Sequence, residues 1–264
     1  MSGSALVVDF HSHAALRVTD MTPHIEHARR RGNDRMVLLG DVLGCGYNPP
    51  IEKVRLINDH TLAFVARHPD FLYGFCFVNP LNEPADSIAE LERCRARGAR
   101  GAKMEVSALA SDRRLDPVME HLRRVRLPLL HHSWNTLSMG RTTVPDCFQT
   151  DPDDIAELAE RFPDVTIIAA HLRPGGARGV WAVRHCRNVH YDTSGGQPTA
   201  EVLEDAVRLL GAERVLFGSD IGFPDGGRDI AVARSCIDDA RLSDRDRELV
   251  LGGNALRLLE GGTR

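Results

Sequence analysis

The 264-residue sequence lacks the features of a membrane or exported protein. It has no apolar run of about 20 residues, the length that spans a bilayer, and its N-terminus shows no charged segment followed by an apolar core. An excess of positive charge is also missing, since the formal net charge is −4. Nucleic acid binds to basic surfaces, so we expect no membrane and no nucleic acid as partner, and a cytoplasmic location.

Paired cysteines and several common catalytic motifs are absent as well. The six cysteines lie far apart without a Cys-x-x-Cys spacing, which excludes a zinc ribbon and argues against a disulfide framework. No Gly-x-Gly-x-x-Gly follows the first strand, and no Gly-x-Ser-x-Gly elbow is present. Lysine is scarce, because only Lys53 and Lys103 occur among 33 basic residues. Arginine serves as the ordinary surface cation here, so each lysine invites a chemical explanation.

The sequence does contain a regular alternation of short apolar strands and amphipathic helices. The predicted strands cover residues 5–13, 36–39, 71–78, 100–106, 127–132, 165–170, 189–193 and 215–218. Helices are predicted between them, a long loop is predicted at 133–150, and two further helices are predicted at 229–240 and 244–259. This pattern is typical of an α/β protein with a parallel sheet. Over residues 1–264 we expect a single-domain (β/α)8 TIM barrel.

Histidine and acidic residues recur where these strands end. His11 and His13 stand two apart in the first strand, so their side chains share one face and can bind one metal ion. A barrel brings the C-terminal ends of its strands to one mouth, where the chemistry of such folds takes place. The other polar residues at these ends are Glu105, His132, His171 and Asp220. We therefore predict a metal centre at the mouth of the barrel.

The ordered motifs resemble the amidohydrolase superfamily, and the resemblance covers essentially the whole chain. The motifs are Val-Asp-Phe-His-Ser-His (8–13), Gly-Ala-Lys-Met (101–104), Leu-Pro-Leu-Leu-His-His (127–132), Ala-His-Leu (170–172), Tyr-Asp-Thr-Ser (191–194), Leu-Phe-Gly-Ser-Asp (216–220) and Gly-Gly-Asn-Ala-Leu-Arg-Leu (252–258). The branch they resemble most contains amidohydrolase-related metal-dependent hydrolases and non-oxidative decarboxylases. The resemblance implies that a divalent metal is held by His11, His13, His132 and Asp220, with His171 close to its water.

The fourth and fifth strands leave the ligand set open. The resemblance makes His132 the ligand and His131 its outward neighbour, because adjacent strand residues face opposite sides. Some superfamily branches bridge two metals through a glutamate or a carboxylated lysine of the fourth strand. Glu105 is therefore either a ligand or the partner of Lys103 in a salt bridge, and Lys103 could itself be carboxylated or bind a substrate carboxylate. We expect zinc, as one ion or two, while manganese, iron, cobalt and nickel also suit these ligands.

Several residues near the predicted strand ends are candidates for substrate binding. They are Arg173, Lys103, Trp134 and Arg141, together with Asn135 and Asp41. Arg173 follows His171 by two residues, and its planar guanidinium group suits a carboxylate.

These residues favour a metal-dependent hydrolase. A divalent cation lowers the pKa of bound water from ~15.7 towards ~7, and Asp220 or His171 would accept the proton and deliver it to the leaving group. The expected substrate is a small polar molecule with a scissile C–N or C–O bond, as in an amide, lactone or ester. Two alternatives are a metal-dependent non-oxidative decarboxylase of a small carboxylic acid and a metal-binding barrel without turnover. A homo-oligomer is compatible with the sequence.

Overall fold

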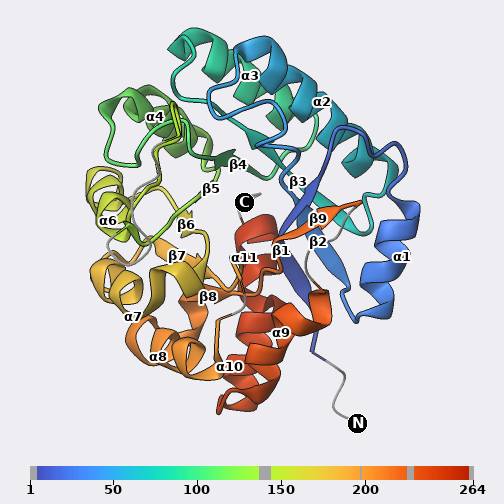
Figure 1. The fold of residues 1–264 in the computed structure, drawn as a ribbon, viewed down its shortest axis with the longest axis vertical. Helices are drawn as coiled ribbons and strands as arrows, with labels where there is room; N and C mark the ends of the chain where they lie inside the picture. Colours follow the sequence, from blue (N-terminus) through green and yellow to red (C-terminus); the bar gives the residue numbers. More distant parts are fainter. Residues whose placement is uncertain (1–4, 137–143, 197, 225–228, 262–264) are drawn as a thin grey trace.

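The strands form one curled parallel sheet (Figure 1). The computed structural model describes residues 5–136, 144–196, 198–224 and 229–261. Within these ranges the sheet has nine strands in the order β8-β7-β6-β5-β4-β3-β2-β1-β9. The strands are β1 (Val8–Ala14), β2 (Arg35–Leu38), β3 (Leu72–Phe77), β4 (Gly101–Met104), β5 (Leu129–His131), β6 (Ile167–Ala169), β7 (Val189–Asp192), β8 (Val215–Leu216) and β9 (Ile221–Phe223).

The sheet closes on itself through the segment that contains β8 and β9. β8 pairs with β7, and β9 pairs with β1 on the other side. Between these two strands, the backbone N–H of Phe10 donates to the carbonyl of Phe217 at 2.8 Å, and that of Asp220 donates to the carbonyl of His11 at 2.8 Å. The predicted eighth strand is therefore a seam that is interrupted at residues 217–220 and then continues as β9. The predicted TIM-barrel fold in a single α/β domain is confirmed.

Helices surround the sheet (Figure 1). They are α1 (Thr22–Arg30), α2 (Ile51–Arg67), α3 (Pro84–Ala96), α4 (Asp116–Val125), α6 (Pro152–Arg161), α7 (Leu172–Val183), α8 (Ala200–Leu210), α9 (Ile230–Asp239), α10 (Asp244–Glu248) and α11 (Asn254–Glu260). Proline lies in the first turn of α1, α3, α4 and α6, where its missing N–H would have no helical partner. Among the helices described, none has the length and apolar character that crossing a bilayer requires.

Two predicted elements have different bounds in the structure. The first strand begins at Val8 rather than at residue 5 and extends to Ala14, so that both of its histidines lie inside it. The single helix predicted at 244–259 is instead α10, a π-helical turn (Leu249–Gly253) and α11. The wide turn brings the chain against the segment before β1, where a Cβ atom on Gly252 would lie 2.3 Å from the carbonyl oxygen of Leu6. Close backbone approach, which the helical period does not reveal, explains the second difference.

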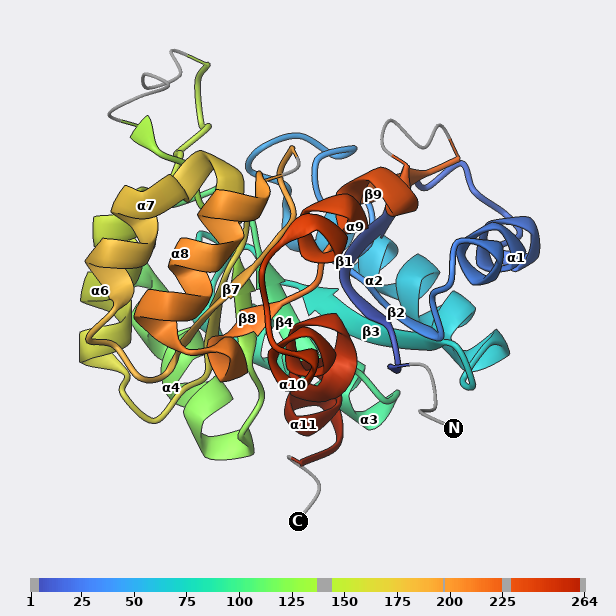
Figure 2. The same cartoon turned by 90° about the horizontal axis from the view of Figure 1, so that it is seen from below.

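Alternate strand side chains fill the barrel interior and meet α11. One buried cluster consists of Val8, Phe10, Val37, Leu39, Tyr73, Phe75, Leu130, Ile168, Ala170 and Leu216 from the strands, with Ala255 and Leu259 from α11. The side chain of Asn254 donates to the carbonyls of Ala212 and Val215, where β8 begins. α11 thereby closes the end of the barrel at which the strands start (Figure 2). The polar residues lie at the other end of the barrel, which is the predicted mouth.

An irregularity in β1 aims its two histidines. Phe10 faces the barrel interior, so a regular strand would turn Ser12 to that side and His11 and His13 away from it. The register of β1 against β2 shifts between Asp9 and Ser12. Such a bulge adds one residue and reverses the alternation beyond it. The shift accounts for the position of both histidines at the mouth.

Candidate metal centre

A cavity of about 350 Å³ opens at the C-terminal ends of the strands. Loop 40–43 and Trp134 form part of its wall. The cavity brings together all six predicted metal-binding residues, which are His11, His13, Glu105, His132, His171 and Asp220. Whether each of them binds metal remains a prediction, and their geometry shows what each could contribute.

His11 is buried and oriented by a carboxylate. Its Nδ1 lies 2.7 Å from Oδ2 of Asp192, and its Nε2 lies 3.1 Å from Nε2 of His13 and 3.6 Å from Oδ1 of Asp220. Burial opposes a charge on the imidazole, but Asp192 outweighs it and raises the pKa of His11. Metal-binding histidines are commonly oriented by a carboxylate on the second ring nitrogen. His11 thus presents Nε2 to the cavity.

His13 presents the same ring atom by a different contact. Its Nδ1 lies 2.8 Å from the carbonyl oxygen of Gly40, and its Nε2 lies 3.6 Å from Oδ1 of Asp220. Burial, and then the neighbouring His11, lowers the pKa of His13 to about 4. The ring is therefore neutral near pH 7, which is the form that binds metal.

The contacts of His171 test whether these residues fit a metal ion. Neither of its ring nitrogens has a hydrogen-bond partner among the described residues, although the side chain is buried. Its Nε2 lies 3.8 Å from Oδ2 of Asp220, and one ligand atom each of His11, His171 and Asp220 fall within 4.8 Å of one another. Burial and then His132 lower the pKa of His171 to about 3. Buried, neutral nitrogens that face a carboxylate fit a divalent cation.

Two of these residues have strained backbones. His171 has φ 74° and ψ 70°, and Asp220 has φ 58°, in the left-handed region that costs a non-glycine residue roughly 1–2 kcal/mol. The N–H of His171 donates to Asp192 Oδ1 at 2.9 Å, which helps to hold its conformation. A Cβ on Gly195, whose φ is +82°, would lie 2.4 Å from the Cβ of His171. Strain that is held in this way is typical of functional sites.

Glu105 is engaged through both of its oxygens. Oε1 lies 2.8 Å from Nδ1 of His132, and Oε2 lies 2.7 Å from Nζ of the fully buried Lys103. Burial disfavours the carboxylate, but the charges of Lys103 and His132 hold the pKa of Glu105 well below its ordinary range. Of the two expectations for Glu105, the structure shows the salt bridge with Lys103. The contact with His132 leaves the other ring nitrogen of that histidine for the cavity.

The predicted substrate-binding residues are only partly brought to the mouth. The ring of Trp134 lines the cavity, nearly parallel to that of His132 with the ring centres 6.1 Å apart. Asp41 also lines it, while its carboxylate accepts hydrogen bonds from the N–H groups of Leu16 and Gly44, both at 2.9 Å. Asn135 is buried nearby in the chain.

Only one of the two predicted arginines, Arg173, lies among the described residues. Arg173 is exposed, donates to the carbonyl of Gly196 and is not among the described residues that line the cavity. Arg141 lies outside the described residues. Their roles in substrate binding remain predictions, and the structure does not bring Arg173 to the site.

Two carboxylates that support the histidines were not singled out from the sequence. Asp192 contacts His11 and also accepts a hydrogen bond from the hydroxyl of Ser194. Asp9 accepts from the N–H of His11 at 3.1 Å and from the hydroxyl of Ser219 at 2.6 Å, and burial raises its pKa to about 6. The sequence could have indicated these two residues, because Asp9 lies inside an apolar strand and Asp192 lies at the end of another.

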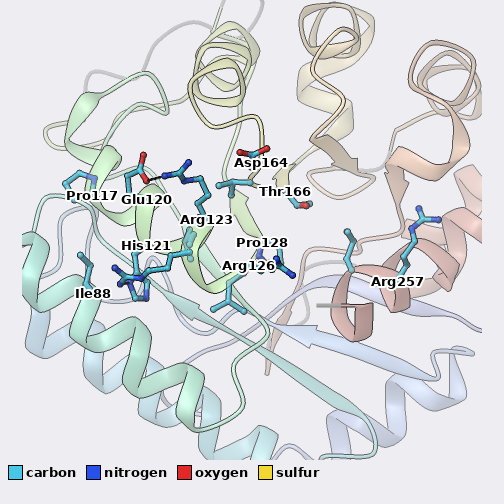
Figure 3. A pocket seen from close by; sticks show the side chains of 15 residues that line it. Ile88, Pro117, Glu120, His121, Arg123, Arg126, Pro128, Asp164, Thr166 and Arg257 are labelled. Carbon is cyan, nitrogen blue, oxygen red and sulfur yellow. Dashed lines mark hydrogen bonds and ion pairs between the residues drawn. The ribbon is translucent and has the colours of Figure 1, made fainter. Parts of the chain in front are cut away.

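A second cavity, with more volume than the one at the mouth, lies at the other end of the barrel (Figure 3). It measures about 1050 Å³ and its lining includes Arg126 and Arg257. Two other lining residues already have partners, since Arg123 contacts Glu120 at 2.7 Å and Arg124 contacts His121 at 2.7 Å. Its charged groups are mostly exposed arginines rather than converging buried ligands, so we assign the chemistry to the smaller cavity at the mouth.

Comparisons with known proteins agree with this fold. Residues 8–261 match the family model described as Amidohydrolase. The gamma-resorcylate decarboxylase of Polaromonas sp. (strain JS666) is 25% identical over 260 residues, which cover 79% of this chain and 76% of that protein.

Two solved structures share the whole fold. The 2,6-dihydroxybenzoate decarboxylase from Rhizobium aligns with a TM-score of 0.78 and 20% identity over 97% of this chain and 98% of its own. A dihydroxybenzoic acid decarboxylase from Polaromonas sp. JS666, solved with bound manganese and the inhibitor 2-nitroresorcinol, aligns with a TM-score of 0.76 and 20% identity over 98% of both chains. The chain therefore belongs to the amidohydrolase family.

Proposed function

We propose that the chain is a metal-dependent non-oxidative decarboxylase of a small carboxylic acid. The observation that carries this proposal is the convergence of His11, His13, His171 and Asp220 on one cavity at the barrel mouth. The same convergence would serve the hydrolase that we expected first. The gamma-resorcylate decarboxylase is 25% identical to the chain over 260 residues, and this similarity favours decarboxylation over hydrolysis.

The metal would be held by nitrogen and oxygen ligands. His11, His13 and Asp220 would bind it, with His132 or His171 completing the set. When bound, the ion supplies a Lewis acid for the carboxylate of the substrate. Zinc and manganese both suit such ligands. One structural relative was solved with bound manganese, so manganese is a candidate beside zinc.

The reaction replaces a C–C bond to the carboxylate by a C–H bond, so the site must deliver one proton to carbon. Asp220 Oδ2 and His171 Nε2 are 3.8 Å apart, close enough to exchange a proton after a small side-chain movement or through one water. Both line the cavity. We assign to this pair the proton that reaches the substrate carbon.

The shape of the cavity suits a substrate with one ring. Ligand pockets commonly measure about 300–1,000 Å³, and about 350 Å³ is at the lower end of that range. Trp134, Val42 and Leu43 supply an apolar wall against which a flat ring can pack. The histidines, Glu105 and Asp220 line the same cavity. A hydroxylated aromatic acid would therefore place its carboxylate towards the histidines and its ring against Trp134.

Hydrolysis is the second candidate, and one contact favours it. Asp220 Oδ1 is 3.6 Å from Nε2 of both His11 and His13. A carboxylate in this position can also take a proton from a water molecule that attacks a carbonyl carbon.

Isotopes separate the two reactions. The metal-loaded protein is incubated with hydroxylated aromatic acids in D₂O, and with lactones and amides in ¹⁸O-labelled water. Decarboxylation releases carbon dioxide and leaves deuterium on the carbon that carried the carboxylate. Products that contain ¹⁸O, without carbon dioxide, would favour the hydrolase. Metal binding without turnover of either panel would favour the non-catalytic barrel.

A further inference from the structure

A second group of metal-binding side chains lies in the outer layer of helices, away from the mouth. One carboxylate oxygen of Glu160, one ring nitrogen of His185 and Sγ of Cys186 all fall within 4.8 Å of one another. Glu160 belongs to the last turn of α6, and the other two residues lie in the turn between α7 and β7. Glu160 Oε1 and His185 Nε2 are already 2.8 Å apart. We propose that this triad is a second metal site, suited to a thiophilic divalent cation such as zinc.

One asparagine fixes the two ligand-bearing segments against each other. The side-chain NH₂ of Asn188 donates to the carbonyls of Ala159 at 3.3 Å, Phe162 at 3.0 Å and Val165 at 3.0 Å. These bonds join the turn that carries His185 to the end of α6. The three potential ligands are therefore presented by backbone that is held in place before any ion binds, which lowers the ordering cost of binding.

An arginine secures the same turn from its other side. The guanidinium of Arg214 is buried and donates to the carbonyls of Val183 at 3.0 Å, Arg184 at 3.1 Å, Cys186 at 2.8 Å and Val189 at 2.7 Å. Its N–H groups are thereby directed at backbone oxygens. The positive charge of Arg214 remains close to the triad and repels a cation. The charge of a bound metal ion must therefore be neutralised by the ligands themselves.

The donor set provides that neutralisation. A thiolate from Cys186 and the carboxylate of Glu160 together balance a divalent charge, and His185 binds as the neutral ring. Sulfur, nitrogen and oxygen are the zinc ligands of proteins, and three of them with a fourth, open position make an accessible site. Burial raises the pKa of the Cys186 thiol, so binding would release its proton.

The triad needs little movement to close on an ion. Ligand atoms around a tetrahedral zinc lie about 3.3–3.8 Å apart, and the atoms of the triad are within 4.8 Å of one another, so no separation would shrink by more than about 1.5 Å. Glu160 and His185 are exposed and free to make that adjustment, while the sulfur of the buried Cys186 stays fixed beneath them. A bound ion would link α6 to the start of β7 and stabilise the fold, because the unfolded chain does not hold the three ligands together.

Cobalt(II) tests the proposal, because only a sulfur ligand gives thiolate-to-cobalt charge-transfer absorption. The described residues that line the mouth include no cysteine, so cobalt bound there by histidine and aspartate gives no such band. In a titration of the full chain, we expect one equivalent of cobalt to produce the band. Cys186→Ser should abolish it and leave the metal content of the mouth unchanged. A titration without the band would overturn the proposal.

Matched variants identify the cysteine and its partners. Cys147 is a partly exposed cysteine that interacts electrostatically with Glu105 at the mouth, so Cys147→Ser is the matched control and should keep the band. His185→Ala changes an exposed side chain with little risk to folding, and should weaken cobalt binding at this site by at least about 10-fold, the lower end for lost support in metal sites. A band that survives in Cys186→Ser or disappears in Cys147→Ser would assign the ion to a different site, as would unchanged affinity in His185→Ala.

Discussion

The two ends of the barrel differ in how their charged groups are arranged. At the mouth, a cavity of about 350 Å³ is lined by buried and partly buried histidines and acids, most of which are oriented by a second polar group. At the opposite end, a cavity of about 1050 Å³ is bordered by exposed arginines and closed from inside by α11. Volume alone would select the wrong end. Convergence and fixed orientation of buried ligands distinguish a reactive site from a surface hollow.

The largest effect should come from the carboxylate at the centre of the mouth. Asp220→Asn keeps the shape of the side chain but removes the charge that faces His11, His13 and His171. We expect kcat/KM to fall by about 10³-fold, within the usual range for a lost proton-transfer group. The matched change Asp164→Asn, in the cavity at the other end, should leave the rate within about twofold. Equal losses in both variants would contradict the assignment of the chemistry to the mouth.

The next effect concerns a buried charge beneath the mouth. Glu105→Gln leaves Lys103 buried without an ionised partner, and the free energy of unfolding should fall by about 3–5 kcal/mol in a urea titration. Adding Lys103→Met should recover most of the loss, because the buried charge is then removed.

An exposed ion pair provides the control for this prediction. Asp205 and Arg208 are 2.8 Å apart on the surface of α8. Asp205→Asn should cost no more than about 1 kcal/mol. An equally small loss in Glu105→Gln would show that the buried pair of Glu105 and Lys103 behaves like an exposed one.

A smaller effect separates steric support from backbone strain. Gly195 and Gly98 both have positive φ, +82° and +93°, but only Gly195 would place a Cβ against another side chain, that of His171. Gly98→Ala should cost only the left-handed strain of roughly 1–2 kcal/mol and leave turnover unchanged. Gly195→Ala should cost more and also lower kcat by displacing His171. Matching results for thermal stability and kcat in the two variants would show that His171 can shift without consequence.

The smallest effect is expected at the arginine-lined end. Arg126 lines the larger cavity and its side chain is exposed. Arg126→Ala should change the free energy of unfolding by no more than about 0.5 kcal/mol, as is usual for surface positions. Its kcat/KM should match that of the unmodified chain. A large loss of activity in Arg126→Ala would contradict the assignment of the chemistry to the mouth.

The fold was predictable because its signals are local and repeated. Apolar strands and amphipathic helices alternate at short intervals, and each strand can be recognised without knowing its neighbours. The interruption of the seam at residues 217–220 was not predictable, because it depends on backbone hydrogen bonds to β1, which is about 200 residues away in the sequence. The π-helical turn depends in the same way on an approach to Leu6.

The convergence of the candidate residues was predictable from the sequence, but their contacts were not. Residues at strand ends converge in any closed barrel, and for this reason all six predicted ligands line one cavity. The bulge in β1, the support of His11 by Asp192 and the position of Arg173 arise from register and loop conformation. Single-sequence patterns carry little information about either. The relatives shifted the proposed reaction from hydrolysis to decarboxylation, a distinction that the shared ligand types do not make.

The seam of the barrel also sets an order of events during synthesis. Asp220 is the last of the six mouth residues to be translated, and it lies in the segment that closes the ring. A nascent chain that has emerged only as far as β7 already carries His11, His13 and His171, but it lacks both the carboxylate and the closing strand. With the proposed ligand set, stable uptake of a metal ion would therefore follow the emergence of this final part, and the barrel would acquire the ion only once it is complete.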